Sequence, residues 1–254
     1  MTTAGLVLVA ILGLCVGSFL NVCIHRLPRG ESLVRPPSRC PRCGRQLSWF
    51  DNIPVFSWIA LLGKCRRCGE PIAIRYPLVE LITAALWVLI AAMTPPDALL
   101  ASRLVLATSL VVLFMIDLEH HILPNVITLP GIVVGFLFSF IAEPFPTSSL
   151  IGIVLGGGVL YAIAAGYYAI RKEEGMGMGD VKMLAMIGAF LGWPAVVLTL
   201  ILSSFSGAII GLAMIAFARA DGRHALPFGT FLALAALIAM LGGEPILNWY
   251  LGRI

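Results

Sequence analysis

Long apolar runs recur along most of this chain and constrain its fold more than any other feature. Of the 254 residues, 59% are hydrophobic and only 12% are charged, whereas soluble domains carry about 25% charged residues. A helix needs about 20 mostly apolar residues to cross the hydrocarbon core of a bilayer. The runs therefore predict an all-α polytopic membrane protein.

The apolar runs predict about eight transmembrane helices, over residues 4–24, 77–94, 98–117, 123–142, 148–170, 181–193, 195–218 and 226–247. The first run lacks the basic start and the small-residue cleavage site of a signal peptide, so we expect it to remain as a span. The sixth run stops at Gly192-Trp193-Pro194 and is short for a crossing, which indicates a broken helix that lines a cavity. Three consecutive glycines, 156–158, are expected to let two helices pack closely.

The basic residues are clustered, and their positions predict the orientation of the chain. Ten of the 17 Lys and Arg residues lie between Arg26 and Arg75, three more flank position 180, and Arg219 and Arg223 share a later loop. Under the positive-inside rule these three clusters face the cytoplasm, with the N-terminus outside. Because the clusters already serve to orient the chain, we expect no nucleic-acid partner.

A polar insert, residues 26–76, separates the first two runs and is too small to form a large core. It contains two Cys-x-x-Cys pairs separated by 21 residues. Four thiolates at this spacing can complete the tetrahedral shell of a structural zinc ion, with redox pairs or two disulfides as the alternatives. A reducing cytoplasm argues against disulfides. The predicted zinc ligands are Cys40, Cys43, Cys65 and Cys68. We thus expect a first helix (1–25), a zinc-binding insert (26–76) and a bundle (77–254).

Two aspartates lie at the edges of apolar runs. Asp117 ends the run 104–116, and Asp180 begins the run that follows Gly177-Met178-Gly179. Simpler explanations are a helix cap for Asp180 and an interfacial position for Asp117. However, a carboxylate near a helix C-terminus opposes the helix dipole, and an ionisable group at membrane depth usually marks function. If the two side chains meet, they form a dyad that can share a proton and activate water.

Several functions remain open from the residues alone. A proton-coupled transporter would explain the aspartates but not the cysteine-bearing insert. A non-enzymatic assembly scaffold would use the insert to bind a partner but would leave the aspartates unexplained. Lys182 could tune the charge of Asp180 or extend to the membrane interface. His120 and His121 are adjacent and most simply solvate a loop.

An ordered set of motifs over about residues 13–235 resembles the type IV prepilin leader peptidases, which are bacterial inner-membrane aspartyl proteases. The motifs are Gly17-Ser-Phe-Leu-Asn21-Val, the two Cys-x-x-Cys pairs, Asp51-Asn-Ile-Pro54, Arg75-Tyr-Pro-Leu-Val-Glu80, Asp117 with Leu123-Pro124-Asn125, Gly177-Met-Gly-Asp180-Val-Lys182 and Pro227-Phe-Gly229. Thr230 departs from the pattern, because the family has proline there.

The resemblance implies that Asp117 and Asp180 are the catalytic pair, supported by Gly177, Gly179 and Lys182. The substrates would be prepilins or pseudopilins, cleaved after a glycine at the cytoplasmic face of the inner membrane. The residue that follows the cleaved bond is usually phenylalanine.

The cysteine-bearing insert resembles that of family members which also methylate the new N-terminus with S-adenosylmethionine, so both activities are expected. The chain has no glycine-rich dinucleotide-binding fingerprint that would locate this cofactor. Asn21, Asn52 and Glu80 are the candidate cofactor-binding residues. The sequence does not indicate an oligomeric state.

Overall fold

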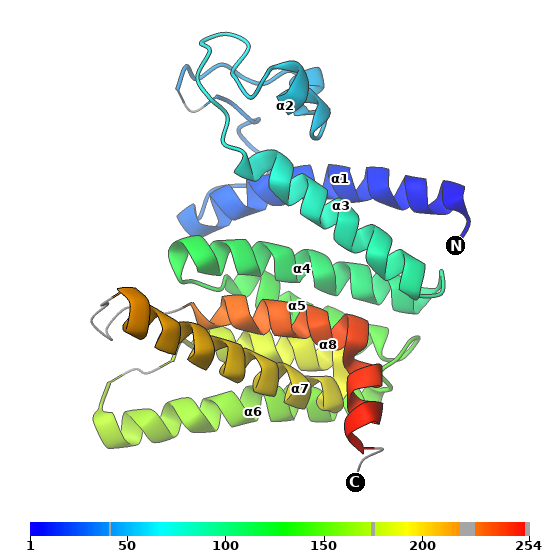
Figure 1. Ribbon diagram of the computed structural model, residues 1–254, viewed down its shortest axis with the longest axis vertical. Helices are drawn as coiled ribbons and strands as arrows, with labels where there is room; N and C mark the ends of the chain where they lie inside the picture. Colours follow the sequence, from blue (N-terminus) through cyan, green and yellow to red (C-terminus); the bar gives the residue numbers. More distant parts are fainter. Residues whose placement is uncertain (41, 174–175, 219–226, 252–254) are drawn as a thin grey trace. The chain divides into compact units, whose positions relative to one another are not determined.

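The structure is a computed structural model that describes residues 1–40, 42–173, 176–218 and 227–251 (Figure 1). Within these residues all regular secondary structure is helical, apart from two isolated β-bridges. The predicted all-α class is confirmed. The chain divides into two compact units, Met1–Pro96 and Asp97–Ile254. Arg219 and Arg223, the third predicted basic cluster, lie outside the described residues.

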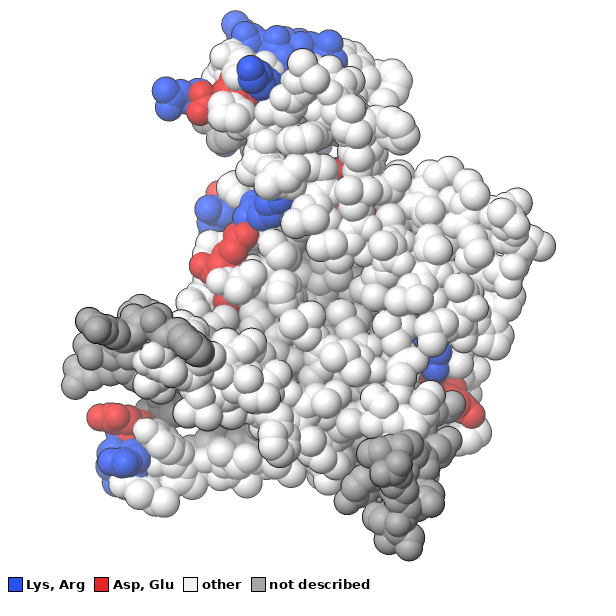
Figure 2. Space-filling model, in the orientation of Figure 1, with Lys and Arg blue, Asp and Glu red and all other residues white. Residues whose placement is uncertain are grey.

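Unit 1 consists of two long helices that pack against each other and the insert between them. The long helices are α1 (Thr3–Arg26) and α3 (Arg75–Met93), and the described part of the insert forms the short helices η1 (Leu27–Arg29), η2 (Trp49–Asn52) and α2 (Phe56–Ala60). The backbones of α1 and α3 approach closely where a Cβ on Gly17 would lie 2.7 Å from the Cα of Glu80. Basic side chains gather over the insert, whereas the long helices present broad uncharged surfaces (Figure 2).

The described residues of unit 2 form five helices, α4 (Ala98–His120), α5 (Asn125–Phe138), α6 (Pro146–Arg171), α7 (Met178–Ala218) and α8 (Phe228–Leu251). Helix α7 packs against α5, α6 and α8, and α4 packs against α8. Met183, Leu184 and Ile187, in the first part of α7, are fully buried. An apolar segment enclosed by other helices needs no polar face, which explains why this run is hydrophobic all round.

The predicted break at 192–194 lies inside α7. Gly192 has a φ of 76° and is not helical, and Pro194 follows it. A Cβ on Gly192 would lie 2.5 Å from the Oγ of Ser148 in α6. Because glycine tolerates positive φ and has no Cβ, it allows the chain to change direction against the start of α6.

Five helices in the described part of the chain are long and apolar enough to cross a membrane: Thr3–Arg29, Arg75–Met93, Ala98–His120, Pro146–Arg171 and Met178–Ala216. Two shorter apolar helices cover Asn125–Phe138 and Phe228–Gly243. Several apolar helices indicate a multi-pass membrane protein. The count of eight crossings stays a prediction, because α5 and the part of α7 before Gly192 are each short for a full span.

Helices α6 and α7 are in backbone contact, although not at all of the predicted glycines. A Cβ on Gly156 would lie 2.7 Å from the carbonyl oxygen of Leu184, as close packing predicts, but Gly158 has no neighbour within 4 Å. The prediction for Gly158 was wrong because two residues along a helix with 3.6 residues per turn place a position on nearly the opposite face from Gly156. The tightest approach is instead at Gly188, where a Cβ would lie 2.2 Å from the Gly152 carbonyl oxygen.

Gly188→Ala is therefore expected to destabilise unit 2 by about 1–3 kcal/mol through overpacking. The backbone of α6 must move to admit the methyl group, because no flexible side chain lies there to yield. Thermal unfolding in detergent measures the effect. Gly158→Ala makes the same chemical change in open space, so its unfolding midpoint should not fall. Equal midpoints for the two variants would contradict the proposed backbone contact.

Candidate functional site

The two aspartates lie at the same end of unit 2. Asp117 lies in the last turn of α4 and Asp180 in the first turn of α7, and their exposed fractions are only 5% and 9%. The two carboxyl groups are close enough to interact electrostatically. Since α7 begins at Met178, Asp180 lies within the first turn and not at the capping position. There the positive end of the helix dipole faces its carboxylate.

Leu123 brings the relevant helix ends together. Helix α4 ends at His120, and the capping residue that follows, His121, has a φ of 54° and turns the chain towards α5. After this turn, Leu123 contacts the starts of two other helices: a Cβ on Gly179 would lie 2.9 Å from it, and a Cβ on Gly229 would lie 3.0 Å from it. The absence of side chains at Gly179 and Gly229 thus allows α7 and α8 to approach the α4–α5 connection.

The start of α8 also binds the carboxylate of Asp117. The backbone N–H of Thr230 donates to Oδ2 of Asp117 at 2.8 Å, and the hydroxyl of Thr230 donates to the Pro227 carbonyl oxygen at 2.6 Å. Proline has no N–H and cannot make the first of these bonds. The departure from the family pattern at position 230 therefore supplies a donor to the candidate catalytic carboxylate, a role that sequence reasoning did not assign.

Lys182 lies beside this site but bonds to another helix. Its ammonium group donates to the side-chain oxygen of Asn125 at 2.9 Å, which links the starts of α7 and α5. His120 lies 3.9 Å from Glu119, its neighbour in sequence. Gly177 directly precedes α7, and a Cβ on it would lie 3.7 Å from Oδ2 of Asp180. Small residues thus flank both carboxylates.

The four predicted cysteine ligands converge in the insert. The sulfur atoms of Cys40, Cys43, Cys65 and Cys68 all lie within 4.8 Å of one another. The Cys40 and Cys68 sulfurs are 3.8 Å apart, which is about the edge of a tetrahedron with zinc–sulfur distances of about 2.3 Å. A disulfide would need about 2.05 Å, and all four thiols are free. The cluster could therefore hold a metal ion.

Each Cys-x-x-Cys pair forms the same tight turn. Gly44 donates to the Cys40 carbonyl oxygen and Gly69 to that of Cys65, both at 3.0 Å. The two glycines have φ values of 68° and 71°, as such turns require. The N–H groups of Cys68 and Arg67 lower the pKa of the Cys65 thiol to about 6. A thiolate is thus present near neutral pH, which is the form that binds a cation.

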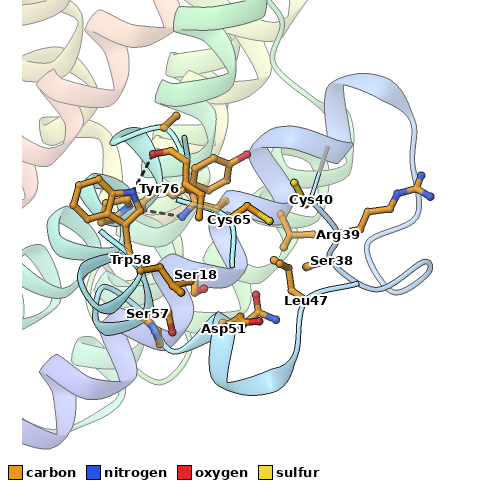
Figure 3. Close-up of a pocket in the computed structure, with 18 of the residues that line it drawn as sticks. Ser18, Ser38, Arg39, Cys40, Leu47, Asp51, Ser57, Trp58, Cys65 and Tyr76 are labelled. Carbon is orange, nitrogen blue, oxygen red and sulfur yellow. Dashed lines mark hydrogen bonds between the residues drawn. The ribbon is translucent and has the colours of Figure 1, made fainter. Parts of the chain in front are cut away.

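A large cavity in unit 1 collects the three candidate cofactor-binding residues (Figure 3). Its volume is about 970 Å³, and Asn21, Asn52 and Glu80 all line it. Sequence reasoning did not single out Trp58 and Tyr76, which also line it. They stand inside or beside the recognised motifs, but nothing in their spacing indicates that their side chains share a cavity.

Two family models match this chain, one over the region that carries the aspartates and one over the region that carries the cysteines. A model described as the type IV leader peptidase family matches residues 104–212, and one described as the bacterial peptidase A24 N-terminal domain matches residues 11–94. A protein of Aeromonas salmonicida, named prepilin leader peptidase/N-methyltransferase, is 39% identical over 273 residues, which cover 97% of this chain and 94% of the relative. The chain belongs to the type IV leader peptidase family.

Other members of this family give the same result. A protein of Pseudomonas aeruginosa with the same name is 38% identical over 267 residues, covering 95% of this chain and 91% of the relative. One from Myxococcus xanthus, also so named, is 43% identical over 215 residues, covering 84% of this chain and 64% of the relative. No solved structure gives a significant match. Both aspartates fall in the peptidase-family match, and all four cysteines fall in the N-terminal match.

Proposed function

We propose that this chain cleaves the leader peptide from type IV prepilins and pseudopilins and then methylates the new N-terminus. The observation that carries the peptidase half is the burial of Asp117 and Asp180 at one end of unit 2, within electrostatic range of each other. The names of the relatives support the substrate class and the second activity. Cleavage follows the glycine that precedes the mature N-terminal residue, usually phenylalanine.

The two carboxyl groups share one proton, because two neighbouring carboxylates in apolar surroundings cannot both stay ionised. The ionised group takes a proton from water as the water oxygen attacks the carbonyl carbon of the scissile bond. The protonated group donates a hydrogen bond to the carbonyl oxygen and stabilises the negative charge that develops there. Collapse of the tetrahedral intermediate breaks the C–N bond, and a proton from the dyad goes to the departing amine.

The proposed orientation places the N-terminus outside and the chemistry at the cytoplasmic face of the bacterial inner membrane. The insert follows α1, and the chain then crosses outward in α3 and returns in α4, whose last turn carries Asp117. Helices α5 and α6 make a second return to Asp180. The basic residues of the insert favour the cytoplasmic side.

The proposed orientation can be tested by labelling from one side of the membrane. A cysteine introduced near Arg42 should react with impermeant maleimide only after inside-out vesicles are prepared.

In the insert, the four cysteines would hold a zinc ion with a closed shell, so this metal would maintain the fold and would take no part in the chemistry. S-adenosylmethionine supplies, when bound, a methyl group on a positively charged sulfur that keeps the bonding electron pair when the methyl leaves. Unit 1 is the part of the chain proposed to bind this cofactor. Asn21 and Glu80, both more than nine-tenths buried, offer acceptor oxygens suited to a cationic ligand.

The deciding experiment incubates the purified full-length protein with a prepilin. Peptidase activity produces a mobility shift of the size of the leader, and added S-adenosylmethionine should raise the mass of the mature product by one methyl group. An intact prepilin would favour the transporter or scaffold alternatives. Cleavage without methylation at saturating cofactor would remove only the second activity.

Gly229→Ala is expected to lower the rate of leader cleavage by about tenfold or more. A Cβ at this position would lie 2.8 Å from Oδ2 of Asp117, so the carboxylate must move, and small displacements of catalytic groups are costly. Initial rates on a prepilin measure the effect. Gly166→Ala is the matched control in the same unit, because nothing lies within 4 Å of its Cβ position. Equal rates for the two variants would contradict the close packing of α8 on Asp117.

A further inference from the structure

The cavity of unit 1 has the size of a cofactor site. It is formed by the C-terminal half of α1, the insert and the first turns of α3. Sites for small molecules and cofactors span about 300–1,000 Å³, and this cavity of about 970 Å³ is at the upper end of that range. Cys40 and Cys65 are part of its wall, so the proposed zinc centre directly supports the cavity.

Two buried acceptor groups line the cavity on its helical side. Glu80 is 7% exposed, and its Oε2 accepts the backbone N–H of Val55 at 2.7 Å. Asn21 is 5% exposed, and its amide nitrogen donates to the Tyr76 carbonyl oxygen at 3.0 Å. The side-chain oxygen of Asn21 is buried without a hydrogen-bond partner. A buried acceptor without a partner is unfavourable, and it would be satisfied by a ligand that carries N–H donors.

The contact between Glu80 and Val55 holds the backbone in an unusual conformation. Val55 has a φ of 62° and a ψ of −50°, a region that a β-branched residue rarely enters. Strain of this kind persists where surrounding contacts enforce it, often at ligand sites. Val55 itself lines the cavity. The carboxylate of Glu80 thus shapes one wall of the cavity besides offering its charge.

The remaining walls combine the aromatic side chains of Trp58 and Tyr76 with five arginines, Arg26, Arg39, Arg45, Arg66 and Arg67. The indole N–H of Trp58 donates to the Ile72 carbonyl oxygen at 3.0 Å, which fixes the ring in the wall. Arg66 is paired with Asp51 at 2.9 Å, so its charge is already compensated. The side chain of Arg39 also lines the cavity, and its guanidinium group extends away from the other labelled residues (Figure 3). An aromatic wall combined with buried acceptors suits a ligand that has both a nucleobase and a positive charge.

We infer that this cavity is the binding site for S-adenosylmethionine, with Glu80 and Asn21 as acceptors for its cationic end. The inference rests on the proposed methyltransferase function and adds the location and the contacts of the cofactor. The carboxylate of Glu80 balances the positive charge of the ligand, and the free oxygen of Asn21 accepts one of its N–H groups. The apolar and aromatic side chains enclose the nucleoside.

Binding of radiolabelled S-adenosylmethionine to the full-length protein in nanodiscs tests this assignment. Glu80→Gln keeps the size of the side chain and an oxygen for the Val55 N–H, but removes the charge. We expect its dissociation constant to rise by at least about tenfold, as loss of a charge-assisted contact predicts. The matched control is Glu143→Gln, an exposed glutamate in unit 2, which should bind as the unmodified chain does. Unchanged affinity in a folded Glu80→Gln protein would overturn the assignment.

A second measurement does not depend on a variant. Ultraviolet cross-linking of the labelled cofactor to the unmodified protein, followed by peptide mapping, should place the label between residues 15 and 80. Label in unit 2 would overturn the inference even if methylation occurs, and would leave the proposed function intact. If the unmodified protein neither binds the cofactor nor methylates pilin, the proposed transferase function fails together with the inference.

Discussion

Replacing either Asp117 or Asp180 with asparagine is expected to slow leader cleavage by at least about 100-fold, the scale of positioned acid–base catalysis. Asparagine has nearly the same shape and can still accept the Thr230 N–H at position 117. It cannot exchange a proton with water, so neither variant can form the proposed dyad. The measurement is the initial rate of leader removal from a purified prepilin, with chain insertion checked by membrane fractionation.

Asp97→Asn provides the matched control for both variants. Asp97 caps the opposite end of α4, where its carboxylate accepts the N–H groups of Leu99 and Leu100 at 2.9 and 3.4 Å. Asparagine caps helices about as well as aspartate, so cleavage should continue at the normal rate. Substantial cleavage by the Asp117 or the Asp180 variant would show that hydrolysis does not need both carboxylates.

Loss of the thiolate cluster is expected to have the second largest effect. The described part of the insert has only short helices and two isolated bridges, and structural zinc supplies most of the folding free energy of such small modules. Cys43→Ser and Cys65→Ser should each reduce bound zinc from about one ion per chain to near zero. Methylation should then be lost, because the cavity wall that includes Cys40 and Cys65 is no longer held.

Leader cleavage should persist in these cysteine variants, since both aspartates lie in the other compact unit. Metal content by elemental analysis and product mass by spectrometry separate the two effects. Cys15→Ser, which alters an exposed thiol outside the cluster, should retain its zinc. A Cys43→Ser protein that methylates normally without zinc would disprove the structural role of the metal.

Features that depend on residues close together in the chain were readable from the sequence. The two Cys-x-x-Cys pairs predicted a cluster, because each pair forms its turn locally. The loop between the pairs then only has to bring the two turns together. The break at Gly192 was predicted from three adjacent residues. Apolar runs located the helices well because a chain in lipid must satisfy its backbone hydrogen bonds internally, which leaves few alternatives to a helix.

Features that depend on how the helices rotate and pack could not be read in this way. The glycines of 156–158 all looked equivalent, yet only the packing of α6 on α7 decides that Gly156 meets a backbone and Gly158 meets none. Likewise, the donor to Asp117 comes from Thr230, a residue 113 positions away. In the sequence, Thr230 was visible only as a departure from the family pattern.

The amino-acid pattern alone thus predicted a helical membrane protein, a four-thiolate cluster and two aspartates placed for chemistry, because hydropathy and short-range spacing act over one turn or one helix. Tertiary packing decided which groups meet. It placed Leu123 between the starts of α7 and α8, and it directed Asn21 and Glu80 into one cavity. The physical reason is that the direction of a side chain depends on the rotation of its helix, which is settled only by close packing against other helices.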